Sequence, residues 1–112
     1  MSWQRDREHY RIQYPAAARP RLVVNGVTYE VLDLSEGGLR VQLPADVPAP
    51  PPDTELGGVL RFRRDDEIVV VRGRVLRTDE RQVAIRLEIG LGFRVVLDEQ
   101  RYLLENDFGR TR

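Results

Sequence analysis

The chain has 112 residues, no cysteine, and 18 acidic residues balanced by 18 basic ones. This length favours a single domain with a modest core. The lack of cysteine excludes disulfides, zinc–thiolate sites and thiol catalysis. Every basic residue is arginine, whose planar head suits bidentate contacts with phosphate and with base edges.

The charge and hydropathy patterns argue against global attraction to polyanions and against insertion into a membrane. Because the net charge is zero, no global field draws the chain to nucleic acid or to anionic lipid. No run approaches the roughly 20 apolar residues of a membrane span, and the first residues lack the apolar core of a signal peptide. We therefore expect a cytoplasmic protein without membrane insertion.

Residues 1–19 are polar, rich in arginine and weakly patterned, and they end in "YPAAARP". Pro15 and Pro20 disfavour helix in the residues just before them. The segment is therefore predicted to be a flexible N-terminal arm that leads into the first strand.

From residue 21 onward the pattern is typical of β-structure. The runs 21–24 and 27–34 flank Asn25 and Gly26, a pair that tolerates positive φ and so predicts a tight hairpin. In residues 38–43, leucine and valine alternate with polar side chains, as in a half-buried strand.

The segment 44–53 holds five of the seven prolines, so it predicts a semi-rigid extended loop. A second hairpin is predicted from the runs 55–64 and 67–77, and one more strand over 82–89. Six short strands at this spacing indicate a small antiparallel barrel or sandwich over residues 20–96. Closure into a six-stranded barrel would remove the exposed sheet edges.

The pattern becomes helical at the end of the chain. Asp98 is a candidate N-cap, and Asn106 or Gly109 can end the helix, so the sequence predicts a short α-helix over 97–108. A helix this short needs tertiary support, and we expect it to pack on the barrel through one side. That side is Tyr102, Leu103 and Leu104.

Patterns that would indicate an enzyme are weak. His9 is the single histidine, so neither a histidine-based triad nor a histidine-rich metal site can form. The chain has no lysine, so a phosphate-binding loop of the lysine type is excluded, and its acidic pairs fall at predicted turns. We expect no catalysis, no metal and no cofactor.

The stretch "DLSEGG" joins two predicted strands through Asp33, Ser35 and Gly38. Taken alone, it is also consistent with an ordinary polar turn. It resembles the D/N-x-S-x-x-G motif of PilZ domains at each of these three positions. Arg7 and Arg11 match the R-x-x-x-R motif of the same family, in the same order along the chain. The predicted barrel and terminal helix agree, so the resemblance to PilZ domains covers nearly the whole chain.

This resemblance implies a six-stranded PilZ-type barrel that binds cyclic di-GMP, a doubly anionic dinucleotide with two guanine bases. Arg7 and Arg11 would fork onto phosphate oxygens or the guanine O6/N7 edge. Asp33 would accept hydrogen bonds from guanine, Ser35 would add a hydroxyl contact, and Gly38 would let the backbone approach the ligand.

Three residues are additional candidates for this site, namely Arg5, Gly37 and Arg77. Among the other arginines, Arg40, Arg72 and Arg74 could border it, but a solvated position on the barrel exterior is the favoured explanation for each. Asp6 precedes Arg7 where many family members have arginine, which leaves open whether one ligand molecule or a stacked pair binds.

The expected function is a non-catalytic module that binds cyclic di-GMP, orders its arm and acts on a downstream protein, as a monomer or weak dimer. Two alternatives remain open. One is a PilZ-type adaptor that does not bind the nucleotide. The other is a small arginine-rich barrel for RNA or single-stranded DNA, which would require aromatic side chains among basic ones. With only 1 Trp, 4 Tyr and 3 Phe, the sequence favours no nucleic-acid polymer.

Overall fold

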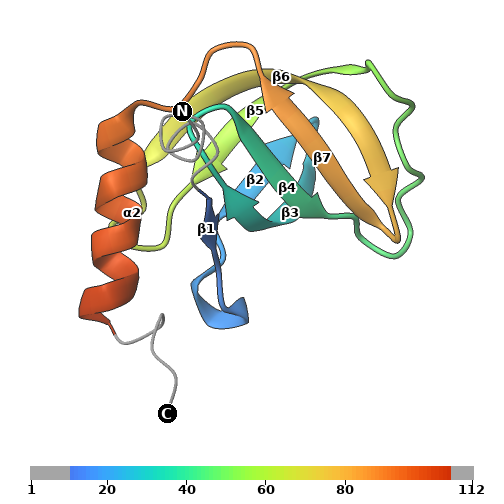
Figure 1. Ribbon diagram of the computed structural model, residues 1–112. Helices are drawn as coiled ribbons and strands as arrows, with labels where there is room; N and C mark the ends of the chain where they lie inside the picture. The colour runs from blue at the N-terminus through green and yellow to red at the C-terminus, as the bar shows by residue number, and fades with distance from the viewer. Residues whose placement is uncertain (1–10, 107–112) are drawn as a thin grey trace, which may run out of the picture.

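The structure is a computed structural model that describes residues 11–106. In chain order its elements are β1 (Ile12–Gln13), a 3-10 helix (Ala16–Ala18), β2 (Arg21–Val24), β3 (Val27–Leu34), β4 (Gly38–Gln42), β5 (Glu55–Arg61), β6 (Ile68–Asp79), β7 (Gln82–Leu87) and α2 (Phe93–Glu105). Strands β2 to β7 form a closed antiparallel barrel, with β1 added to the edge of β3 (Figure 1). The predicted six-stranded barrel with a C-terminal helix is confirmed.

The barrel closes through the strand order β3–β2–β5–β6–β7–β4, because β4 pairs back onto β3. The longest strand is β6, which pairs with β5 along its first half and with β7 along its second half. At Gly73 the chain passes so close to β7 that an added Cβ would lie 2.4 Å from the carbonyl oxygen of Arg86. The barrel wall therefore requires glycine at this position.

The first hairpin forms as its sequence predicts. Asn25 and Gly26 have φ values of 50° and 81°, and Val24 pairs with Val27 across a two-residue loop. Positive φ at both central residues matches the strand twist, and this is why the Asn–Gly pair specifies the turn.

The core fills the barrel interior with the inward residues of each strand. Its most enclosed members are Val31, Leu34, Leu60 and Phe62, each 0% exposed. Burial of a side chain of this size stabilises the fold by about 1.5–3 kcal/mol.

The region before β2 differs from the expected flexible arm over 1–19. Residues 1–10 lie outside the described part of the chain, but residues 11–19 are packed. Ile12 is 4% exposed and Tyr14 6% exposed, and Ile12 pairs with Leu34 of β3. The prediction failed for residues 11–19 because a two-residue strand leaves too short an alternation to detect.

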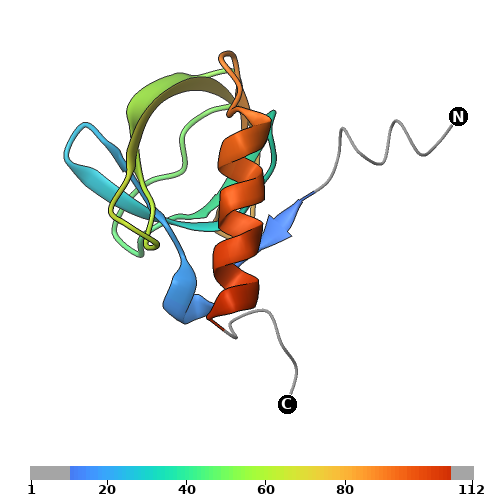
Figure 2. The same cartoon turned by 90° about the vertical axis from the view of Figure 1, so that its left-hand side faces the viewer.

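The helix α2 begins at Phe93, four residues before the predicted start at 97, and ends at Glu105, with Asn106, one of the two predicted stops, as its C-cap. Gly92 is its N-cap, so Asp98 lies inside the helix instead of capping it. The expected packing side is corrected as well, because Leu103 is buried whereas Leu104 is 52% exposed. The helix lies on one side of the barrel with β1 next to it (Figures 1 and 2).

No helix among residues 11–106 is long and apolar enough to cross a membrane.

Candidate functional site

The turn between β3 and β4 is fixed by backbone hydrogen bonds. The Ser35 N–H donates to the carbonyl of Gly38 at 2.9 Å, and the Leu87 N–H donates to the carbonyl of Gly37 at 2.9 Å. A Cβ at Gly38 would lie 3.0 Å from the carbonyl oxygen of Ile85, which explains glycine at the start of β4. The turn is therefore a rigid part of the barrel rim.

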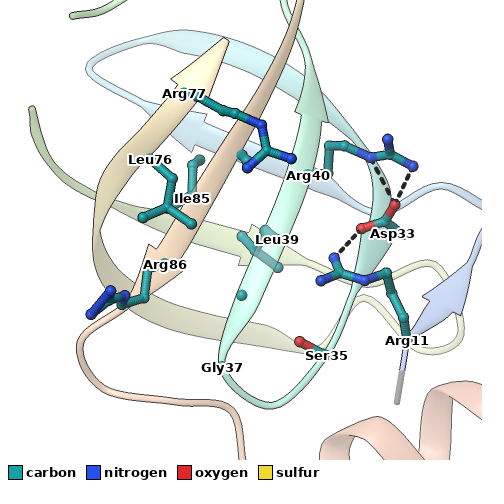
Figure 3. Close-up of a pocket in the computed structure, with 12 residues that line it drawn as sticks. Arg11, Asp33, Ser35, Gly37, Leu39, Arg40, Leu76, Arg77, Ile85 and Arg86 are labelled. Carbon is teal, nitrogen blue, oxygen red and sulfur yellow. Dashed lines mark hydrogen bonds and ion pairs between the residues drawn. The ribbon is translucent and has the colours of Figure 1, made fainter. Parts of the chain in front are cut away.

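Asp33 is a buried carboxylate that holds two arginines. It lies at the end of β3, is 1% exposed, and its Oδ1 accepts a hydrogen bond of 2.8 Å from Nη1 of Arg11. Its Oδ2 accepts from Nε of Arg40 at 2.8 Å and lies 2.6 Å from Nη2 of the same guanidinium. Each arginine is 43% exposed. Figure 3 shows both guanidinium groups directed at the Asp33 carboxylate. Asp33 thus fixes two guanidinium groups whose other N–H groups have no hydrogen-bond partner among residues 11–106.

These groups lie in a cavity of about 520 Å³ on the outer face of β3, β4, β7 and β6 (Figure 3). A volume of this order is typical of sites for small ligands. Its described lining residues are Arg11, Asp33, Ser35, Gly37, Gly38, Leu39, Arg40, Leu76, Arg77, Ala84, Ile85 and Arg86. Four arginines therefore surround one carboxylate, and the resulting positive charge suits an anionic ligand.

A β-bulge in β6 shapes the far wall of the cavity. The register with β7 shifts between Val75 and Arg77, so Leu76 and Arg77 both line the cavity. Leu76 is 46% exposed and offers an apolar surface, whereas Arg77 is paired with Asp79 at 2.9 Å. Bulges commonly redirect side chains next to binding sites, and this one provides an apolar contact beside a cation.

A second cluster of charged groups lies between β1 and α2. Glu99 of α2 is 1% exposed and accepts hydrogen bonds from the Tyr14 hydroxyl at 2.6 Å and from Nε of Arg64 at 2.7 Å. Burial raises the pKa of Glu99, and these hydrogen bonds partly oppose the shift. Burial and the neighbouring Glu99 carboxylate also raise the pKa of the Tyr14 hydroxyl, which stays protonated. The cluster holds the segment that follows Arg11 against the helix.

The structure brings together most of the residues that the sequence singled out. Six of them line one cavity, namely Arg11, Asp33, Ser35, Gly37, Gly38 and Arg77. Arg5 and Arg7 lie outside the described residues. Arg40 also lines the cavity, whereas Arg72 and Arg74 do not.

Sequence reasoning missed Arg86 and Leu76. Aligning the predicted strands β4 and β7 could have identified Arg86, because it lies directly opposite Gly38 in their register. Leu76 depends on the bulge, for which the sequence has no clear pattern. Among residues 11–106, no group of three or more metal-ligating side chains is close enough to hold a metal ion.

Comparison with known proteins agrees with this architecture. The chain is similar in structure to an uncharacterized protein of Legionella, with a TM-score of 0.59 at 14% identity, over 88% of this chain and 98% of that one. It also matches the PilZ domain of CeSA from a cellulose-synthesizing bacterium, with a TM-score of 0.48 at 21% identity, over 89% and 96% of the two chains. No curated protein matches significantly. The family model of the PilZ domain matches residues 5–107, nearly the whole chain, and the chain therefore belongs to the PilZ domain family.

Proposed function

We propose that this chain is a receptor for cyclic di-GMP and that it acts on a partner protein without catalysing a reaction. PilZ domains are in general non-catalytic modules that bind this dinucleotide. The main observation in support is the cationic cavity in which buried Asp33 fixes Arg11 and Arg40 beside the β3–β4 turn.

The cavity matches the chemistry of the dinucleotide in three respects. Arg11 and Arg40 are already oriented, so they can bind phosphate oxygens or the guanine O6/N7 edge at a reduced entropic cost. Leu76 provides an apolar contact for the face of a base. Gly38 lines the cavity with backbone atoms alone, because glycine there lets β4 approach the carbonyl oxygen of Ile85.

Asp33 would have two roles in this site. In the structure it orients the arginines, and because it is 1% exposed, its carboxylate reaches a ligand only when one of them moves. We propose that guanine then takes the place of one arginine, with its N1–H and amino group donating to the carboxylate. Ser35 would add a hydroxyl contact from the same turn.

Arg7 would complete the clamp, with Arg5 as a further candidate. Arg11 directly precedes β1, whose Ile12 and Gln13 pair with Leu34 and Asp33. The point from which the preceding residues extend is therefore fixed beside the cavity. We propose that the residues before Arg11 become ordered over the ligand and that this ordering conveys the signal to a partner.

The alternatives are less well supported. A PilZ-type adaptor that does not bind the nucleotide would have no need of arginines preoriented around a cavity. An RNA or single-stranded DNA site would present aromatic side chains for stacking, and none of the described lining residues is aromatic.

Isothermal titration calorimetry with cyclic di-GMP tests this proposal. We expect saturable binding to the wild type, no binding of GTP, and at least about tenfold weaker binding after Arg7→Ala or Arg11→Ala, since each bidentate contact is worth about 1–3 kcal/mol. Arg101→Ala, an exposed arginine of α2, is the matched control and should bind normally. An absence of binding to the wild type would favour the adaptor. Unchanged affinity in both clamp variants would show that the arginines are wrongly assigned.

A further inference from the structure

The outer face of β2, β5 and β6 has an exposed apolar row. Val23 pairs with Val59, and Val59 pairs with Val70, so the three side chains lie side by side across three strands. Val70 is 78% exposed and Val23 37% exposed, and Ile68 in β6 is 52% exposed. Valine at this level of exposure contributes little to the core, so the row is available to a partner.

Arginines border this row on both sides. Arg21 and Arg61 lie directly opposite one another, two residues along their strands from Val23 and Val59. Arg72 lies two residues beyond Val70 on the other side and faces Gly57. Among residues 11–106, none of these three arginines makes an ion pair, although like charges directly opposite one another are destabilising. Glu30 of β3, also opposite Arg21, pairs with Arg19 instead, so this face offers cations to an acidic partner.

A small recess of about 110 Å³ lies beside Arg21 and Arg61, next to the valine row. It is also lined by Phe62, Arg63 and Asp66, so three arginines there outnumber a single carboxylate. The recess shares no lining residue with the cavity beside Asp33. The first half of β6 belongs to this face, whereas its second half lines the cavity.

From this arrangement we infer that the face binds a protein helix with an apolar stripe flanked by acidic side chains. Four residues along the strands separate the Arg21–Arg61 pair from the level of Arg72, about 13 Å, which accommodates a helix of about 10–12 Å in diameter lying across the strands. The valine row spans two strand spacings, about 10 Å, or roughly two helical turns. Apolar residues at helical spacing would contact the valines, and carboxylates on both flanks would meet the arginines.

Charge and composition favour this occupant over three others. A second copy of the chain would bring arginine against arginine in a symmetric interface. A membrane-binding surface usually inserts large side chains such as Trp, Phe or Leu, whereas the apolar residues of this face are three valines and Ile68. Nucleic acid would leave the apolar row without a stacking partner, because no aromatic side chain accompanies it.

Only the role of this face in signalling depends on the proposed function. A synthetic amphipathic peptide tests the face itself: a helix of about four turns with a leucine stripe and flanking glutamates, labelled for fluorescence anisotropy. We expect the wild type to bind it, and to bind a matched peptide with lysine in place of glutamate at least about tenfold more weakly. Since the titration contains no cyclic di-GMP, its failure is distinct from a failure of the receptor proposal.

The double variant Arg21→Glu, Arg61→Glu should bind the acidic peptide at least about tenfold more weakly, because two attractions become repulsions. Val70→Ser should also weaken binding, whereas Arg101→Glu on α2 should leave it unchanged. Arg21→Gln with Arg61→Gln repeats the test without charge reversal, should the first pair disturb folding. Equal binding of both peptides, or equal binding by the double variant and the control, would overturn the inference. Co-sedimentation of the wild type but not the double variant with phosphatidylglycerol vesicles, without peptide binding, would assign the face to lipid instead.

Discussion

Removing the arginines around Asp33 tests whether this carboxylate is a shared anchor. Arg11→Ala alone should lower the free energy of unfolding by about 1 kcal/mol, because its guanidinium is 43% exposed and Arg40 still neutralises the carboxylate. Arg40→Ala should cost about 1–2 kcal/mol, since both of its contacts with Oδ2 are lost.

The double variant is the informative one. With both arginines removed, Asp33 would be a buried, 1% exposed charge with no cation among its described partners. Breaking a buried ion pair by removal of one sign typically costs about 3–5 kcal/mol, so the double variant should lose about 4 kcal/mol. This exceeds the sum of the two single losses by about 1–2 kcal/mol, a coupling within the usual range for residues that share a partner.

Urea unfolding followed by circular dichroism measures all four proteins of this cycle. For a domain of this size, 1 kcal/mol corresponds to about 4–8 °C in Tm, so the double variant should show a large thermal shift as well. Arg101→Ala provides the baseline for loss of an exposed arginine. Additive losses in the double variant would refute the shared anchor, because each arginine would then act independently of Asp33.

Two further predictions concern the cluster around Glu99 and the barrel wall. Because burial raises the pKa of Glu99, its protonated form is favoured in the folded state, so this contribution to stability is present below the unfolded pKa and is lost as pH rises through the folded value. As the pH rises from 4.5 to neutral, the free energy of unfolding of Glu99→Gln should therefore increase relative to that of the wild type in urea unfolding. The same difference between the two proteins at both pH values would contradict this. Gly73→Ala should lower the free energy of unfolding by at least about 2 kcal/mol, since its Cβ would lie 2.4 Å from a carbonyl of Arg86, and an unshifted urea midpoint would argue against that contact.

The six barrel strands could be predicted because each has a local pattern that the barrel preserves. Alternation in residues 38–43 and the Asn25–Gly26 pair are such patterns, and both hold in the structure. The meeting of Arg11 with the β3–β4 turn also follows from sequence, although through the resemblance to PilZ domains. No periodicity would have placed residue 11 beside Asp33, which is 22 positions away.

Features that depend on irregular geometry could not be predicted. Strict alternation along β6 would place Arg77 on the face opposite Leu76, and only the bulge after Val75 brings both into the cavity. The helix start was misplaced because Asp98 is a typical N-cap residue, whereas the actual N-cap, Gly92, makes no side-chain capping hydrogen bond. Glu99 also lies on the buried face of α2, where a charged residue interrupts the apolar stripe. Its partner Tyr14 is 85 positions away, a separation that no local pattern encodes.

Long-range contacts connect both Arg11 and the β3–β4 turn to the helix α2. The turn after Asp33 is tied to the start of α2, since the N–H of Leu91 donates to the carbonyl of Glu36 at 2.8 Å. Arg11 is tied to the same helix through Tyr14, three residues later, whose hydroxyl donates to Glu99. A ligand that draws Arg11 and the turn toward each other would thus act on α2 at two points. The helix is therefore the described element best placed to register whether the cavity is filled, because its position depends on Arg11 and the turn at once.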